Sequence, residues 1–134
     1  MTATITRMNP PTLPDAGAIG YSQISVMEPG RMAFVSGQVA IRAGEAVPED
    51  VAEQARVAAS NCVAALEALG AGVADIAMLR VFMVDLTPET LDRAFPAVLE
   101  MLDGVQPSLT GVGVAALAEP ELKIELEMVV RLPD

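Results

Sequence analysis

Two glutamates near the C-terminus carry the clearest potential for acid–base chemistry. Glu125 and Glu127 alternate with apolar residues in residues 122–131, so they share one face of a predicted strand, about 7 Å apart. Two carboxylates at this separation can exchange protons with a ligand or bind a metal ion. A solvated strand face explains the same spacing without any chemistry, so both readings stay open.

Two further segments carry groups that can contact a ligand. Ser36-Gly37-Gln38 follows a predicted strand, and glycine lets a ligand approach the backbone N–H groups closely. A simple bulge at the strand end is an equally good interpretation. Tyr21, the only tyrosine, could orient a ligand through its phenol or fill a gap at the surface.

The chain has no histidine and a single cysteine among its 134 residues. These counts exclude Ser–His and Cys–His nucleophiles, imidazole bases, His-ligated zinc and an internal disulfide. A chain without disulfides fits a reducing cytoplasm, and we expect Cys62 to be a buried, inert thiol on an apolar helix face. The glycines at 111 and 113 resemble part of a dinucleotide-binding motif, but no helix is expected after them, so we expect no bound cofactor. We also expect no metal.

The charge and the hydropathy pattern limit the partners. Lys and Arg number 8 against 18 Asp and Glu, a net charge of −10, which disfavours nucleic acid. The longest stretch without a polar residue, 111–118, is far shorter than the roughly 20 residues that span a bilayer, so we expect no membrane contact. Hydrophobic residues make up 52% of the chain, which indicates an apolar patch that is either exposed or covered by another subunit.

Hydrophobic periodicity predicts the elements that must position these residues. Helices are expected at 49–69 and from Thr87 to about 102, where Pro96 implies either a kink or a start near Asp92. Strands are expected at 22–27 and 32–35, joined as a hairpin, and at 39–41, 78–84, 109–117 and 122–131. The apolar run 78–84 is typical of a strand that is buried on both faces.

This order predicts an α+β two-layer sandwich, with two helices on one face of a mixed sheet. Residues 1–16 are expected to form an extended arm, and residues 17–134 a single domain. The other sheet face must then be wet or covered by another subunit. If it is covered, Glu125 or Glu127 becomes partly buried, and burial favours the protonated form of a carboxylate.

An ordered series of short motifs resembles the reactive intermediate deaminase (Rid, or YjgF) family over about residues 17–131. The matching pieces are Tyr21-Ser22-Gln23, Val35-Ser36-Gly37-Gln38, residues 48–51 (PEDV), Gln54, Asn61, residues 67–72 (EALGAG), Asp75-Ile76, Val81-Phe82, Asp85-Leu86 and Ile124-Glu125-Leu126-Glu127. The resemblance implies a chorismate-mutase-like fold, a homotrimer, and small-molecule sites in clefts between subunits. It also implies hydrolysis of enamines and imines to a keto acid and ammonia. In this family a glutamate handling water and protons corresponds to Glu125, while Tyr21 and the backbone near Ser36 and Gly37 line the pocket.

One position departs from the family pattern. The family has an arginine in a Pro-x-Arg-Ser/Thr segment that pairs with the substrate carboxylate. This chain has Pro107-Ser108-Leu109-Thr110, so it resembles the subgroup that lacks the arginine, and Leu109 makes the pocket floor apolar. Arg93, which aligns with a family asparagine, could supply a displaced cation or could be an ordinary surface charge.

The sequence therefore favours hydrolytic deamination of a small imine, enamine or related intermediate. The substrate would lack an α-carboxylate or present it elsewhere than at Leu109. The alternative is a non-catalytic trimer that binds or senses a small molecule in the same cleft, and the sequence leaves the choice open. Endoribonuclease activity, which an older name for the family suggests, is disfavoured by the negative net charge and by the absence of histidine.

Overall fold

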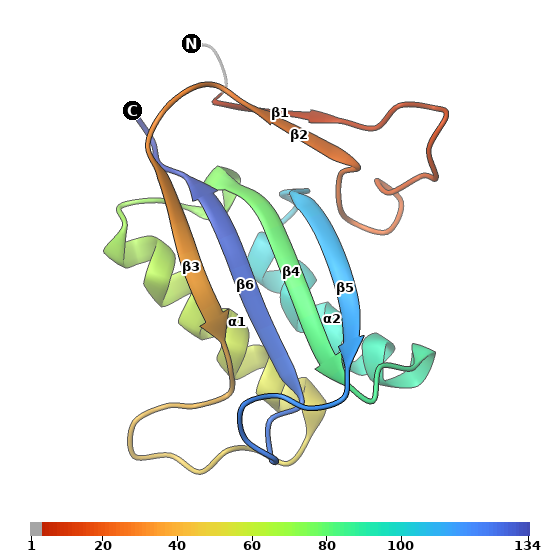
Figure 1. Cartoon of the computed structure of the whole chain (residues 1–134), viewed down its shortest axis with the longest axis vertical. Helices are drawn as coiled ribbons and strands as arrows, with labels where there is room; N and C mark the ends of the chain where they lie inside the picture. The colour runs from red at the N-terminus through yellow and green to blue at the C-terminus, as the bar shows by residue number, and fades with distance from the viewer. Residues whose placement is uncertain (1–3) are drawn as a thin grey trace.

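A computed structural model describes residues 4–134, and Figure 1 shows the arrangement of their elements. Residues 1–3 of the expected arm lie outside the described residues. The elements in order are β1 (Ile5–Met8), β2 (Ile24–Met27), β3 (Met32–Gln38), α1 (Val51–Ala68), a short 3₁₀ helix (Val73–Asp75), β4 (Ile76–Val84), α2 (Pro88–Leu102), β5 (Ser108–Val114) and β6 (Ile124–Arg131).

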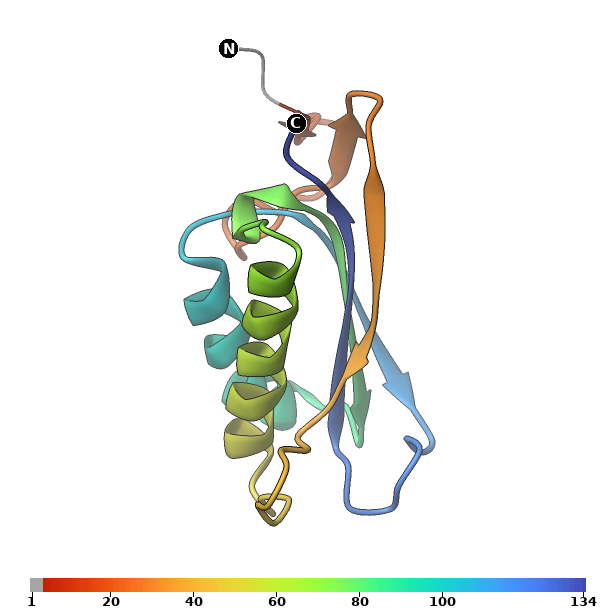
Figure 2. The ribbon, with the colours of Figure 1, turned by 90° about the vertical axis from the view of Figure 1, so that its left-hand side faces the viewer.

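Four strands form the main sheet in the order β3-β6-β4-β5. Strands β4 and β5 are parallel, while β6 is antiparallel to both β3 and β4, so the sheet is mixed. Both helices pack on one face of this sheet, which Figure 2 shows edge-on. The α+β two-layer architecture predicted from the sequence is confirmed.

The two helices begin where their capping residues predict. Asp50 caps α1 by accepting a hydrogen bond from the backbone N–H of Glu53 at 3.3 Å. Thr87 and Thr90 cap α2 reciprocally, and Pro88 occupies its first turn. Helix α2 continues through Pro96 to Leu102, so the alternative start near Asp92 is wrong.

The expected hairpin between residues 22–27 and 32–35 is wrong. Strand β2 pairs with β1, and β3 pairs with β6 across the main sheet. Residues 5–8, within the segment expected as an extended arm, therefore form a strand of a second, two-stranded sheet. The turn between β2 and β3 is fixed instead by Arg131, whose buried guanidinium donates to the carbonyls of Glu28 at 3.1 Å and Pro29 at 2.6 Å.

Two polar side chains of α1 hold the loops at the end of the sheet where β3 ends and β6 begins. Buried Gln54 donates to the carbonyls of Pro48 and Glu121 and accepts from the backbone of Lys123, which fixes the start of β6. Asn61 donates to the carbonyls of Val39 and Ile41. These carbonyls bond to the helix, and the short strand expected at 39–41 does not form.

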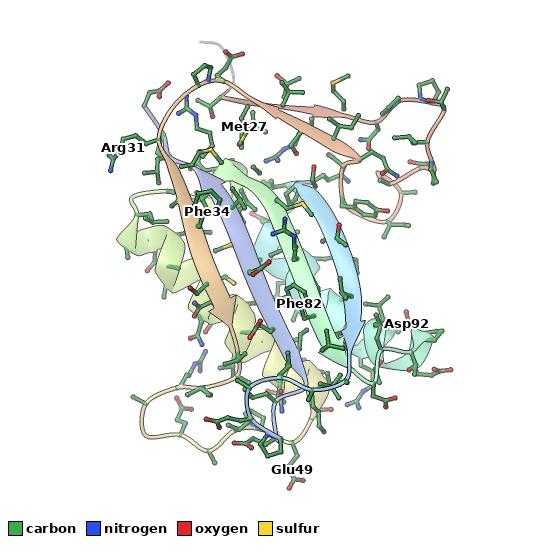
Figure 3. All side chains as sticks on the ribbon, viewed as in Figure 1. Met27, Arg31, Phe34, Glu49, Phe82 and Asp92 are labelled. Carbon is green, nitrogen blue, oxygen red and sulfur yellow. The ribbon has the colours of Figure 1, made fainter. Side chains whose placement is uncertain are left out.

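Within residues 4–134, no helix covers the second face of the main sheet. Leu79, Val81 and Met83 of β4 are buried against the helices, whereas Met78, Arg80, Phe82 and Val84 alternate with them on the uncovered face. The expectation that 78–84 is buried on both faces is therefore wrong for a single chain. Phe34 and Phe82 lie on this open face (Figure 3), and Phe34 is 76% exposed.

Candidate functional site

Glu125 and Gly37 are in direct contact on neighbouring strands. The register between β3 and β6 shifts after Val35, which pairs with Met128, so Ser36 and Gly37 form a bulge before Gln38 pairs with Leu126. A Cβ built on Gly37 would lie 2.3 Å from the carboxyl carbon of Glu125. Only glycine lets the Glu125 carboxylate lie this close to the backbone.

Ser36 projects from the same bulge onto the uncovered sheet face. It lines a hollow of about 230 Å³ together with Phe34, Arg80, Glu127 and Val129. Nη1 of Arg80 lies 3.0 Å from Oε1 of Glu127, its register partner on β6. The sequence alone did not identify Arg80 as a site residue, because it lies inside an apolar run. A single charge in such a run, opposite a glutamate of the closing strand, is the signal that could have found it.

Tyr21 and Leu109 come together in a different place. They line an apolar pocket of about 330 Å³ between α2 and the edge strand β5, with Ile19, Val81, Leu91, Asp92, Phe95 and Gly111. Leu109 pairs in register with buried Leu79, so its side chain is on the helix side of the sheet. Among the described residues, no arginine or lysine lines this pocket, and the one charged residue in its lining is Asp92.

A single chain does not bring these two groups of residues together. Gly37 is on β3 and Leu109 on β5, which are the opposite edges of the four-stranded sheet. The two edge strands are three strand spacings apart, about 14 Å. Glu125 faces the uncovered side, whereas Leu109 faces the helices.

Arg93 lies away from both groups. Its guanidinium pairs with Asp50, the cap of α1, in a charged pocket of about 300 Å³ that also contains Glu49, Asp85 and Lys123. Arg93 does not line the pocket of Tyr21 and Leu109. In one chain it therefore supplies no cation at Leu109.

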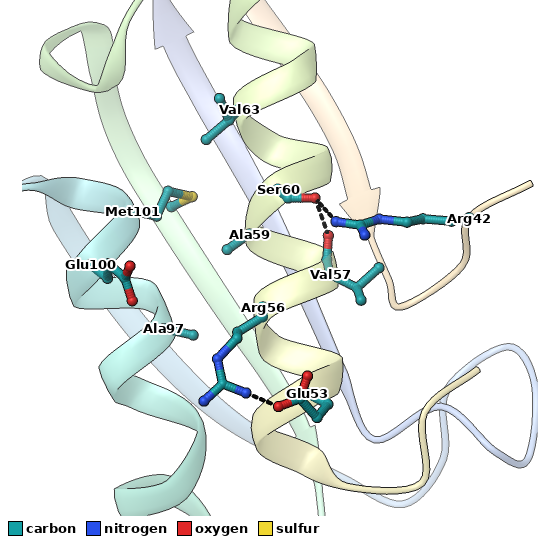
Figure 4. A pocket seen from close by; sticks show the side chains of 10 residues that line it. All are labelled: Arg42, Glu53, Arg56, Val57, Ala59, Ser60, Val63, Ala97, Glu100 and Met101. Carbon is teal, nitrogen blue, oxygen red and sulfur yellow. Dashed lines mark hydrogen bonds and ion pairs between the residues drawn. The ribbon is translucent and has the colours of Figure 1, made fainter. Parts of the chain in front are cut away.

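A groove between α1 and α2, of about 630 Å³, contains none of the expected site residues (Figure 4). Its arginines are engaged on the helix surface, Arg42 with the hydroxyl of Ser60 and Arg56 with Glu53. Cys62 of α1 is fully buried, and burial raises the pKa of its thiol to about 12, which keeps the thiol protonated and unreactive.

Between residues 4 and 134, no three His, Cys, Asp or Glu side chains cluster in a way that could hold a metal ion. Among the helices of the same residues, none combines the length and the apolar character needed to cross a bilayer.

Known proteins match this chain over almost its whole length. The profile of the endoribonuclease L-PSP family matches residues 14–132. A 2-iminobutanoate/2-iminopropanoate deaminase of Salmonella typhimurium is 34% identical over 132 residues, which are 96% of this chain and 97% of that protein.

Solved structures agree with the sequence matches. YyfB of Yersinia pestis, a protein of unknown function from the conserved Rid family, superposes with a TM-score of 0.90 at 30% identity, over 96% of this chain and 99% of that one. Escherichia coli TdcF with bound serine gives a TM-score of 0.65 at 32% identity, over 83% and 87% of the two chains. The chain therefore belongs to the endoribonuclease L-PSP family, the family of the Rid (YjgF) proteins.

Proposed function

We propose that this protein hydrolyses a small reactive imine or enamine to a carbonyl compound and ammonia. The observation that carries the proposal is the contact of the Glu125 carboxylate with the backbone at Gly37, on a sheet face that no helix covers. The name of the Salmonella relative, a deaminase of 2-imino acids, supports the same reaction type.

We infer that the working cleft forms between copies of the chain, in a homotrimer. Phe34 is 76% exposed on the open sheet face, which also carries the partly exposed Phe82, and a second copy would remove this apolar surface from water. The same packing would supply Tyr21 and Leu109 of one copy to Glu125 and Gly37 of the next. This arrangement accounts for two groups of site residues that one chain keeps apart.

The chemistry requires one group that exchanges protons. Glu125 takes a proton from water while the water oxygen bonds to the carbon of the N-protonated imine, which gives a carbinolamine. The proton then passes from Glu125 to nitrogen, the C–N bond breaks as the hydroxyl proton returns to Glu125 and a carbonyl forms, and ammonia leaves. For an enamine, protonation of the carbon precedes these steps. Tyr21 and the backbone at Gly37 orient the substrate.

The pocket around Leu109 favours an apolar part of the substrate. Its lining is aliphatic and aromatic except for Asp92, and an unpaired carboxylate placed there would lose hydration without gaining a cation. A substrate carboxylate, where there is one, therefore binds elsewhere in the cleft.

The first test is ammonia release from a panel of freshly generated imines, some with and some without a carboxylate. We expect the protein to release ammonia from at least one of them faster than buffer does. A panel on which no imine reacts faster than in buffer contradicts the proposal. Ligands that raise the melting temperature without being consumed would then point to the non-catalytic alternative.

The trimer has its own test in Phe34→Asp. A charge at this position opposes burial of the open sheet face, so the native mass should fall from three times the 13.9 kDa of one chain to that of a single chain. Native mass spectrometry measures this directly. The matched control is Val63→Asp, on the exposed surface of α1, which should leave the assembly intact. A wild-type chain that is itself monomeric would refute the trimer.

A further inference from the structure

Arg80 lies where a cation on the uncovered sheet face can meet a ligand. It is central on β4, with Glu127 of β6 on one side and Thr110 of β5 on the other. Its side chain is 42% exposed and shares the hollow that Ser36 lines. Ser36 belongs to the bulge that contacts Glu125, and Arg80 and Glu125 lie on the same face of the sheet.

The guanidinium of Arg80 has unused capacity for hydrogen bonding. Within the part of the chain that the structure describes, it donates one hydrogen bond, from Nη1 to Oε1 of Glu127 at 3.0 Å. A guanidinium carries five N–H donors in a planar fork that matches a carboxylate. Because both partners of the pair are about one-third or more exposed, the pair contributes little to stability, and an incoming anion can replace Glu127.

Most of the other cations already have partners. Arg7 and Arg131 bond to backbone carbonyls, Arg56 and Arg93 pair with carboxylates beside the helices, and Lys123 bonds to the carbonyl of Glu49. In a chain with a net charge of −10, a small anion that enters the open face needs a local cation, and Arg80 is the one beside Ser36.

We propose that Arg80 binds the anionic group of the ligand, a carboxylate, with the Ser36 hydroxyl as a second donor. The inference rests on the proposed function, since it concerns the same cleft, and it assigns to β4 the cation that Leu109 does not provide. Glu127 is the resting partner of Arg80 and is displaced on binding. Phe34 and Val129 line the same hollow and would exclude water from the new ion pair.

The position of Arg80 also orients the ligand toward Glu125. Arg80 pairs in register with Glu127, and Phe82 pairs with Glu125, so Glu125 is one pleat away on the same face. Glutamates two residues apart on a strand are about 7 Å apart. A ligand of three or four carbons held by its carboxylate at Arg80 therefore presents its second carbon to Glu125.

The inference is tested by titrating pyruvate, and its uncharged isostere pyruvamide, into the protein by isothermal titration calorimetry. Pyruvate should bind to the wild type saturably. Pyruvamide should bind to the wild type with at least about tenfold lower affinity than pyruvate does. Pyruvate should bind to Arg80→Met with at least about tenfold lower affinity than to the wild type. The matched control Arg56→Met, which removes an exposed paired arginine on α1, should bind pyruvate within about twofold of the wild type.

Glu127→Gln separates a binding role from a structural one. Removing the competing carboxylate should tighten pyruvate binding by about two- to fivefold, whereas a purely structural pair would give no tightening. Arg80→Lys keeps the charge without the fork and should recover part of the affinity, which gives a second variant if Arg80→Met does not fold.

Equal pyruvate affinity in the wild type and Arg80→Met, or no saturable pyruvate binding to the wild type, would overturn the inference. The ammonia assay separates this failure from failure of the proposed function. Binding that depends on Arg80 in a protein that releases no ammonia refutes the activity and retains the anion site. Ammonia release by a protein whose pyruvate affinity does not depend on Arg80 refutes the anion site and retains the activity.

Discussion

Replacing Glu125 with glutamine should lower the rate of ammonia release by about 10²- to 10⁴-fold, the usual contribution of a general acid–base group. Glutamine keeps the size and the hydrogen-bonding oxygen of the side chain but cannot take a proton from water. The loss should therefore occur in kcat, with KM changed much less. The measurement is the steady-state rate on the best imine of the panel, with the spontaneous rate subtracted.

Two further variants define what the loss means. Glu125→Ala should lose as much activity as Glu125→Gln, because both remove the ionisable group. Glu100→Gln, an exposed carboxylate on α2 beside the groove of Figure 4, should leave kcat unchanged. A Glu125→Gln protein that keeps the wild-type rate would show that Glu125 does not handle the proton, and the proposed reaction would lose its catalytic group.

The sequence predicted the elements whose periodicity is local. The apolar face of 49–69 and the strict alternation of 122–131 each specify one buried face, and the structure has α1 and β6 at these places. Both helices on one side of a mixed sheet follow from their positions between strands. The family resemblance, carried by short motifs in order, agrees with the matches to known Rid proteins.

Strand pairing was less predictable because it depends on distant residues. Residues 28–31 have turn-forming types, but the chain bends there without joining β2 to β3 as a hairpin. The bend is fixed by Arg131, about one hundred residues further along the sequence, which donates to two carbonyls of the turn. A buried arginine on the polar side of the last strand has the sequence pattern of an exposed one.

The site was predictable by residue type but not by arrangement. Tyr21 does meet Leu109, and Gly37 does meet Glu125, yet these two pairs occupy different faces and opposite edges of the sheet. Arg93, considered as a displaced cation, pairs with Asp50 instead. Arg80 was hidden in an apolar run, and only the register of β4 on β6 shows that it faces Glu127.

Gly37→Ala should lower the rate of ammonia release by about a hundredfold, because small misplacements of a catalytic group can cost this much. The added Cβ would lie 2.3 Å from the carboxyl carbon of Glu125 and 2.5 Å from Oε2, so the carboxylate has to move. The atoms that it meets are the flexible end of a side chain. We therefore expect a displaced Glu125 and a melting temperature close to that of the wild type.

The matched control is Gly72→Ala, since a Cβ on Gly72 meets nothing within 4 Å, and it should change neither activity nor stability. The decisive measurement is the double variant Gly37→Ala with Glu125→Gln. If Gly37 acts only by giving room to the Glu125 carboxylate, adding Gly37→Ala to Glu125→Gln should cost almost no further rate, so the two effects are strongly non-additive. Fully additive losses would mean that the added methyl group also disturbs the contact of the substrate with the backbone at position 37, and does not act through Glu125 alone.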